Sequence, residues 1–263
     1  MARFCTLASG SSGNAAYVGS GGSAVLVDLG ISCKAAVTAL KELNLEESHL
    51  EGILITHEHI DHIRGLKVFL KSRRLPVYAS AEVLDYLTSH DCLPAHTSAV
   101  EIKPGKTQIG SLQVECFDTS HDSVHSLGYR ITMPDERRVT VATDLGVLDT
   151  QVRYYLLKSD LVLLESNYDT RMLETGSYPY HLKRRISGKN GHLSNDDCAA
   201  QLPELIHNGT TRIVLAHLSK ENNLPALAYQ TALSELALEG MEEGKDFLLS
   251  VAPRYSPSPL TVF

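Results

Sequence analysis

The sequence of 263 residues has no apolar run that approaches the ~18 residues of a transmembrane helix, so we expect no membrane span. Its first residues show no apolar core of a signal peptide, and we expect a cytoplasmic protein. The five cysteines are odd in number, scattered, and without a Cys-x-x-Cys pair. This usage indicates free thiols in a reducing compartment.

The chain also lacks an excess of positive charge. Its formal net charge of -7 argues against a protein that coats nucleic acid. A nuclease is not excluded, because bound metal ions add positive charge that the formal count omits. The length and a hydrophobic content of 43% suffice for a large core, and we expect residues 1–263 to form one domain.

The most informative segment is residues 56–62, THEHIDH, which directly follows an apolar run. That run predicts a buried strand, and open α/β sheets place their sites at the carboxyl ends of strands. Imidazole and carboxylate are the usual ligands of zinc, manganese and iron. Because side chains alternate along an extended segment, His57 and His59 can point to one side. Asp61 and His62 follow a bend and could serve a second metal.

Other predicted strands deliver an acidic residue or a histidine at or just beyond their carboxyl ends. In isolation each has an ordinary structural explanation, such as a helix cap for the aspartates or a core position for the last histidine. One loop offers two histidines, of which the first directly follows the strand and is the preferred candidate over His125. The candidates are Asp28, His121, Asp144, Glu165 and His217.

Two further segments could contact a substrate. Residues 9–14, SGSSGN, join two predicted strands, and their amides and hydroxyls could line a site or simply form a hairpin turn. Residues 178–190 hold the densest group of basic residues in the chain, with interleaved tyrosines. Such a segment could track phosphates and stack bases, or be a solvated, mobile loop.

Caps and periodicity predict five helices and a last strand. The helices are expected from Ser32 to Leu43, over 63–74, over 81–90 after Ser80, from Ser194 to about 208, and over 224–239, with a strand over 246–251.

The order His-x-His-x-Asp-His resembles the signature of the metallo-β-lactamase fold hydrolases, and the likeness extends over nearly the whole chain. The sequence resembles in particular the YycJ/WalJ-type branch, which begins with a similar Ser-Gly-Ser-Ser-Gly-Asn loop beside the metals. Relatives of this branch, tRNase Z and the RNase J group, are nucleases. The resemblance implies a four-layer αββα sandwich with the site along one edge of two sheets, whereas composition alone supports only an α/β fold.

The resemblance also assigns roles to single residues. One metal would be held by His57, His59 and His121, and a second by Asp61, His62 and His217, with Asp144 as the bridge. Asp28 would orient the metal loop. Asp61, Glu165 and His192 would be the catalytic residues, the last two as a pair that protonates the leaving oxygen, although His192 could instead only contact phosphate. Residues expected to contact the substrate are Ser12, Asn14, Lys183, Arg184 and Arg185.

The implied reaction is hydrolysis of a phosphodiester with two divalent ions, zinc first, with manganese or iron as alternatives. The interval between Asp144 and His217 is too short for the extra domain of the RNase J group, the tRNA-gripping arm of tRNase Z has no counterpart, and a β-lactamase would carry a secretion signal. These departures favour a compact exonuclease acting on DNA rather than RNA. The alternatives are a cyclic phosphodiesterase of the PhnP type and a metal-binding regulator without hydrolysis, against which the Glu165–His192 pair argues.

Overall fold

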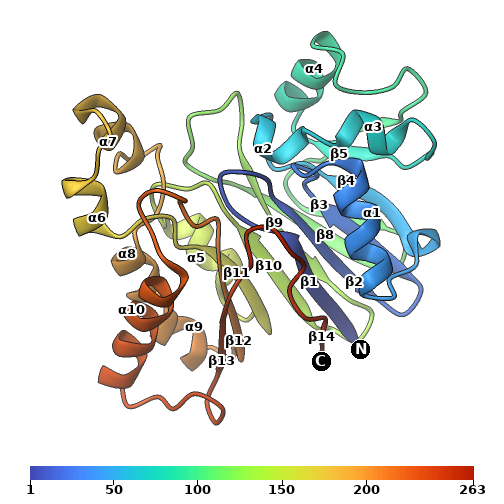
Figure 1. The fold of residues 1–263 in the computed structure, drawn as a ribbon. Helices are drawn as coiled ribbons and strands as arrows, with labels where there is room; N and C mark the ends of the chain where they lie inside the picture. The colour runs from blue at the N-terminus through green and yellow to red at the C-terminus, as the bar shows by residue number, and fades with distance from the viewer.

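The computed structural model describes residues 1–263 and contains two seven-stranded sheets packed face to face, with helices on their outer faces (Figure 1). The strand orders are β14-β1-β2-β3-β4-β5-β6 and β13-β12-β11-β10-β9-β8-β7. This arrangement confirms the α/β sandwich expected from the resemblance. No helix of the structure combines the length and the apolar character that crossing a bilayer requires.

Each sheet is antiparallel at one side and parallel at the other, so several strands end at the same edge. The first sheet contains β1 (Ala2–Ala8), β2 (Ala15–Ser20), β3 (Ser23–Val27), β4 (Leu50–Leu54), β5 (Val77–Ala79), β6 (Ala99–Glu101) and β14 (Thr261–Val262). The second contains β7 (Lys106–Ile109), β8 (Leu112–Asp118), β9 (Leu127–Thr132), β10 (Arg138–Ala142), β11 (Leu161–Glu165), β12 (Arg212–Ala216) and β13 (Leu248–Val251).

The helices cover the two outer faces. On the side of the first sheet these are α1 (Cys33–Glu42), the 3-10 turn Glu47–His49, α2 (Ile60–Ile63), α3 (Leu66–Leu70) and α4 (Ala81–Ser89). On the side of the second sheet they are α5 (Thr150–Leu156), α6 (Thr170–Thr175), α7 (Tyr180–Ile186), α8 (Asn195–Ala199), α9 (Leu202–His207) and α10 (Pro225–Leu238).

Three apolar layers hold this arrangement together. The middle layer lies between the sheets and includes Phe4, Tyr129 and Val141. One outer layer joins the first sheet to its helices around Phe69, and the other joins the second sheet to its helices around Leu236. Because the central strands are covered on both faces, most of their residues are buried and apolar, which is why they could be recognised in the sequence.

Several helix starts follow from the sequence. The Ser32, Ser80 and Ser194 side chains accept hydrogen bonds from the amides of Ala35, Val83 and Asp197, so these three predicted caps are confirmed. The continuous helix predicted over 63–74 is wrong, because the chain forms the short helices α2 and α3. Between them the Gly65 amide donates to the carbonyl of Leu29, while the carbonyl of Asp61 accepts from the amide of Asn14, so the hydrogen-bond pattern of a continuous helix is interrupted.

Two other expectations need correction. The helix predicted from Ser194 to about 208 is divided into α8 and α9, and Pro203 lies in the first turn of α9, where it lacks the amide needed to continue a preceding helix. The basic segment 178–190 is not a loop throughout, because it contains α7. That helix buries no residue, so it shows no apolar stripe by which periodicity could identify it.

Candidate metal centre

The seven side chains that the sequence predicted as metal ligands lie together at one edge of the two sheets. They come from the segments that follow β4, β8, β10 and β12, with Asp61 and His62 on α2, and their ligand atoms fall into groups within 4.8 Å of one another. One group is His57, His59 and His121, and another is Asp61, His62 and His217. Asp144 belongs to two further groups, one with His57 and His62 and one with Glu165, His192 and His217.

The backbone is strained at two of these positions and at Asp28, which was predicted to orient the metal loop. Asp28, Asp144 and His217 have φ angles of 60°, 56° and 55°, in the left-handed region that residues other than glycine seldom adopt. Each lies within two residues of the end of a strand. Such a conformation costs on the order of 1–3 kcal/mol and persists where the surroundings impose it, which is typical of functional sites.

A chain of hydrogen bonds fixes the orientation of His57. Both carboxylate oxygens of Asp28 are used by Thr56, one by its amide at 2.8 Å and the other by its hydroxyl at 2.9 Å. With its hydrogen donated, the Thr56 hydroxyl oxygen accepts from Nδ1 of His57 at 3.0 Å. Nε2 of His57 then carries a lone pair, yet it is buried without any hydrogen-bond partner. A buried acceptor of this kind needs a cation or a donor.

His121 and His59 face each other beside His57. Nδ1 of His121 donates to the carbonyl of Gly191 at 3.1 Å, so its Nε2 has the free lone pair, 3.3 Å from Nδ1 of His59. Burial lowers the pKa of His121 and, more strongly, that of His57. Both imidazoles are therefore kept in the neutral form that binds metal ions.

The second group is oriented by two buried carboxylates. Nδ1 of His62 donates to Asp28 at 2.7 Å, and Nδ1 of His217 donates to Glu165 at 2.7 Å. The Nε2 atoms of the two rings lie 3.6 Å and 3.5 Å from the same carboxylate oxygen of Asp61. Carboxylates behind ligating histidines commonly fix their tautomer in this way.

Negative charge dominates the second group. Burial would lower the pKa of His217, but Asp144 and the neighbouring carboxylates outweigh it and raise that pKa to about 10. Burial would likewise lower the pKa of His62, but its carboxylate neighbours hold it well above its ordinary value. For Glu165, burial raises the pKa, but the His192 imidazole and hydrogen bonds lower it to about 2. These carboxylates thus require positive charge, which divalent cations would supply in place of protons.

Asp144 lies between the two groups. One oxygen, Oδ2, is buried and makes no hydrogen bond, although Nε2 of His62 is only 3.2 Å away. The other, Oδ1, lies 3.4 Å from Nδ1 of His217 and 3.7 Å from Nε2 of His121. A single carboxylate can therefore contact cations in both groups.

Glu165 and His192 form a hydrogen-bonded pair at the side of the centre. Nδ1 of His192 donates to Oε1 of Glu165 at 2.9 Å, while Oε2 accepts from the amides of Leu145 and Leu193 at 2.9 and 3.2 Å. The carboxylate is completely buried, and the imidazole lines the cavity over the centre. With Nδ1 engaged, Nε2 is the nitrogen left for a substrate.

The N-terminal loop 9–14 contacts the centre through Asn14 and not through Ser12. The Asn14 amide nitrogen lies 3.1 Å from Nε2 of His62 and 3.4 Å from Asp61, and its side-chain oxygen accepts from the amide of Gly10. Ser11 lines the cavity at the centre, whereas Ser12 faces another cavity on the far side of the loop. The loop is therefore more than a hairpin turn.

Close packing also fixes the loop after β3 beside the segment that carries Asp61. A Cβ atom on Gly30 would lie 1.5 Å from the carbonyl oxygen of Asp61, so only glycine allows the loop after β3 to pass here.

Of the three basic residues predicted to contact the substrate, only Arg185 lines the cavity, which has a volume of about 260 Å³. It pairs with Asp122, with Nη2 at 3.0 Å from Oδ1, and so ties α7 to the loop that carries His121. Nζ of Lys183 donates instead to the carbonyl of Glu174 at 2.8 Å. The Arg184 guanidinium lies 5.9 Å from the centre of the Tyr180 ring, which belongs to the same helix.

Sequence reasoning missed Glu58, although it lies inside the histidine motif. Its carboxylate is buried, and Oε1 accepts from the amide of Val124 at 3.0 Å, which fixes the loop that carries His121. The competing histidine of that loop, His125, lies outside the ligand groups. Its ring is held between Glu82 and Asp118 at 2.9 and 2.8 Å.

Comparison with known proteins identifies the family. Residues 24–218 match the family model described as a beta-lactamase superfamily domain. The chain is 36% identical over 262 residues to the exodeoxyribonuclease WalJ of Streptococcus pneumoniae serotype 2 (strain D39), covering 98% of this chain and 97% of that protein. It is 35% identical over 247 residues to the exodeoxyribonuclease YycJ of Bacillus anthracis, covering 93% and 92%.

A solved structure shows the same fold. The metallo-beta-lactamase fold protein YhfI from Bacillus subtilis matches with a TM-score of 0.73 at 16% identity, covering 98% of this chain and 99% of that chain. At this identity the likeness concerns the fold alone. The family match and the two relatives together show that the chain belongs to the metallo-β-lactamase fold hydrolases of the β-lactamase superfamily, in the branch of WalJ and YycJ.

Proposed function

We propose that this hydrolase is a metal-dependent DNA exonuclease that uses two divalent cations. The observation that carries the proposal is the position of Asp144 between two groups of imidazoles, beside the Glu165–His192 pair. The relatives that match over nearly the whole chain are named exodeoxyribonucleases, which supports DNA as the substrate.

The donor set fits two cations. His57 presents an unpartnered, buried Nε2 atom and Asp144 an unpartnered, buried Oδ2 atom, and both would gain a partner from a bound cation. One cation would be held by His57, His59 and His121, the other by Asp61, His62 and His217, with Asp144 shared. Donors that are all nitrogen and oxygen suit zinc, with manganese or iron as alternatives. When bound, such cations would lower the pKa of a coordinated water and neutralise charge on a phosphodiester.

The residues of the chain itself position and protonate the substrate. Asp28 and Glu165 hold imidazole rings in fixed orientations, so the ligands need no rearrangement when a strand binds. His192 lines the cavity with Nδ1 held by Glu165, and we assign it as the donor of a proton from Nε2 to the leaving oxygen. This role is worth typically about 10²–10⁴-fold in rate. Arg185 is the cation best placed to contact the phosphate, whereas Asn14 is buried outside this cavity and contacts Asp61 and His62.

The alternatives differ in what they need from this site. A regulator that only binds metal would have no use for a histidine held by a buried carboxylate at the side of the centre. A small cyclic phosphodiesterase would use the same centre but would need no path for a strand. We also propose a cytoplasmic site of action, supported by the five cysteines, all of which are free thiols.

The test is to incubate the metal-loaded protein with single- and double-stranded DNA and RNA, labelled at the 5′ or the 3′ end, beside bis(p-nitrophenyl) phosphate. We expect stepwise shortening of DNA from one end, faster than of RNA. The Asp144→Ala variant, prepared in parallel, controls for contaminating nucleases. Hydrolysis of the small diester with all strands left intact would overturn the exonuclease in favour of the small phosphodiesterase.

A further inference from the structure

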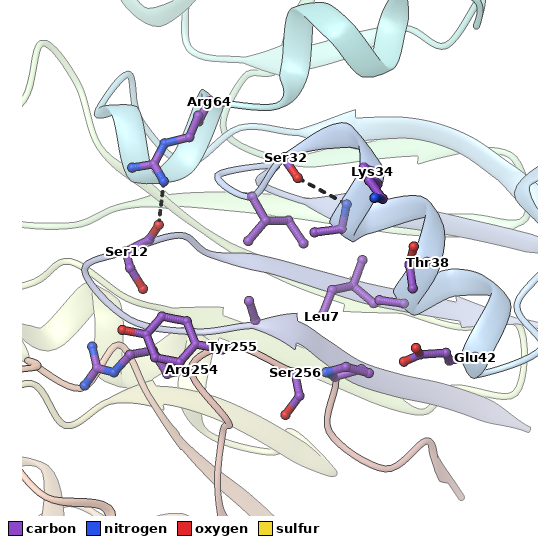
Figure 2. A pocket seen from close by; sticks show the side chains of 15 residues that line it. Leu7, Ser12, Ser32, Lys34, Thr38, Glu42, Arg64, Arg254, Tyr255 and Ser256 are labelled. Carbon is purple, nitrogen blue, oxygen red and sulfur yellow. Dashed lines mark hydrogen bonds between the residues drawn. The ribbon is translucent and has the colours of Figure 1, made fainter.

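A second cavity, of about 700 Å³, lies behind the N-terminal loop, between α1 and the C-terminal segment that follows β13 (Figure 2). Its volume falls within the ~300–1,000 Å³ typical of ligand sites. None of the residues assigned above to cation binding or proton transfer lines it. Figure 2 shows Arg64, Arg254 and Tyr255 gathered at the end beside Ser12, while Glu42 lies at the far end of α1.

This cavity and the metal centre are separated by a single loop. Ser11 lines the cavity at the centre, and its neighbour Ser12 lines the second cavity. Arg64 follows the ligand His62 by two residues, and its guanidinium donates to the carbonyl of Ser12 at 2.9 Å. A strand that leaves the metal centre over Ser11 therefore meets the arginine-lined end first.

The cations here lack the partners that other cations of the chain have. Arg64, Lys34 and Arg254 form no ion pair in the structure, although the chain as a whole is acidic with a net charge of -7. Arg185, on the other side of the centre, is by contrast paired with Asp122. Three unpaired cations around one cavity indicate an anionic ligand.

Arg254 gives the strongest indication. Its Nη1 atom is buried and has no hydrogen-bond partner. The same atom would lie 2.9 Å from a Cβ atom on Gly10, so the guanidinium packs against the backbone of the loop that holds Asn14 on the metal loop. A charged donor without a partner is costly, and the guanidinium, which also lines the cavity, would gain an acceptor from an anion bound there.

An aromatic side chain completes the arrangement. Tyr255, next to Arg254, is 74% exposed and lies at the mouth of the cavity (Figure 2). Its ring therefore offers a free face. A cationic surface for the backbone combined with an aromatic face for a base is the usual means of holding single-stranded nucleic acid.

We propose that this second cavity binds the part of the DNA strand that adjoins the scissile phosphodiester, with backbone phosphates on Arg254 and Arg64 and a base stacked on Tyr255. The inference rests on the proposed exonuclease function and extends it, since it names the path of the strand. Because Glu42 makes the far end of the cavity acidic, the strand contacts the arginine-lined end over one or two phosphates and then continues into solvent.

The first experiment is a salt titration of the affinity of the metal-loaded protein for a single-stranded oligonucleotide made resistant to hydrolysis by phosphorothioate linkages. For single strands each lost phosphate contact reduces the slope of log affinity against log salt by about 0.7. We expect Arg254→Gln to weaken binding and to reduce the slope by about 0.7. Arg74→Gln, which neutralises an exposed arginine outside the cavity, serves as the matched control and should keep the wild-type slope.

The outcomes separate this inference from the function on which it rests. Failure of the wild-type protein to shorten any labelled strand would overturn the exonuclease itself. If the wild-type protein shortens DNA but Arg254→Gln keeps the wild-type slope, the exonuclease stands and the second cavity is not its strand path. Circular dichroism of the variant guards against misfolding, and Arg64→Gln tests the other arginine of the same end should Arg254→Gln fail to fold.

The second experiment places the strand directly. Oligonucleotides carrying 5-bromodeoxyuridine at successive positions from the end are irradiated on the metal-loaded protein, and the cross-linked peptide is identified by mass spectrometry. We expect a cross-link to the peptide that contains Tyr255, confined to one or two positions of the strand and lost in Tyr255→Leu. Cross-links only to Tyr178 or Tyr180, near α7, would place the strand on the other side of the centre and overturn the proposal.

Discussion

Asp144 is the residue on which both imidazole groups converge, and its removal is the most direct test of the centre. We expect Asp144→Ala to lose occupancy at both cation positions and to lose activity, because no other carboxylate lies within 4 Å of both His62 and His121. The measurement is elemental analysis of the protein after reconstitution with excess metal, beside its rate on labelled DNA. Wild-type protein should hold two equivalents.

A matched control is Asp85→Ala, which removes an exposed carboxylate of α4 that makes no hydrogen bond or ion pair. It should keep both metals and full activity. Two equivalents and near-normal turnover in Asp144→Ala would show that the centre does not depend on a shared carboxylate, and Asp61 would then be the residue to test.

His192 allows proton donation to be separated from phosphate binding. His192→Ala should keep both metals, because this histidine belongs to neither imidazole group. Its rate on DNA should fall by about 10²–10⁴-fold, since the 3′-oxygen or 5′-oxygen of a nucleotide is a poor leaving group. On bis(p-nitrophenyl) phosphate the loss should be far smaller, because p-nitrophenolate leaves without a proton. Equal losses on the two substrates would assign His192 to phosphate binding instead.

The side chains that meet at the centre could be predicted from the sequence because each follows a strand whose buried residues are mostly apolar. Strand ends of one sheet share an edge, so a polar residue at each end is enough to suggest a site. Glu58 and Asp122 could not be assigned in this way. Their roles depend on Val124 and Arg185, which approach them only after the loops have folded.

At the scale of elements, long buried strands and capped amphipathic helices were predictable, and short exposed helices were not. α1, α4 and α10 lie within a residue or two of their predicted limits, whereas α5, α6 and α7 were not predicted. The Asp149 and Asp169 side chains cap α5 and α6, but an aspartate before a short polar segment is as common in turns. A capping residue in the sequence therefore indicates where a helix would start, but it does not show that a helix forms.

His125 joins two of these elements, and its contribution should depend on pH. Burial lowers its pKa, but hydrogen bonds to Asp118 on β8 and Glu82 on α4 outweigh burial and raise that pKa. A group whose pKa is higher in the folded state stabilises the fold fully below its unfolded pKa, about 6.5 for histidine. The stabilisation is lost as pH rises through the raised pKa of the folded state.

We therefore expect the melting temperature of the wild-type protein to exceed that of His125→Gln at about pH 6, where the imidazole is charged in both states. The difference should shrink steadily toward alkaline pH. Thermal unfolding at several pH values measures it, and Glu82→Gln, which removes one of the two partners, should show a smaller version of the same trend. A difference that is constant with pH would mean that His125 acts by packing and not by charge.

At the scale of the whole molecule, the C-terminal segment was the least predictable part. β14 returns to pair with β1, so that the two ends of the chain lie side by side (Figure 1). On the way, Arg254 reaches Gly10 beside the metal centre. No local pattern in a short polar segment with prolines reveals contacts with residues more than two hundred positions away. We propose that residues 1–263 fold as one unit, because both ends of the chain contribute to the same sheet.

The metal centre also joins the two sheets, and this predicts a dependence of stability on metal. His57, His59, Asp61 and His62 follow a strand of the first sheet, while His121, Asp144 and His217 follow strands of the second. Cations that bind only the folded chain stabilise it by about 2.7 kcal/mol per site at a hundred times the dissociation constant. At about 2–4 °C per kcal/mol, removal of one such cation lowers the melting temperature by roughly 5–10 °C.

The experiment compares thermal unfolding of the metal-loaded protein, the protein stripped with a chelator, and the stripped protein after zinc is restored. We expect a lower melting temperature on stripping and full recovery with zinc. Asp144→Ala should respond little to the chelator, because it holds little metal to lose. The response of this variant therefore shows how much of the change in melting temperature comes from the chelator itself rather than from the loss of metal. An unchanged melting temperature, with loss of metal verified by elemental analysis, would mean that the hydrogen bonds from Asp28 and Glu165 hold the imidazoles without help from cations.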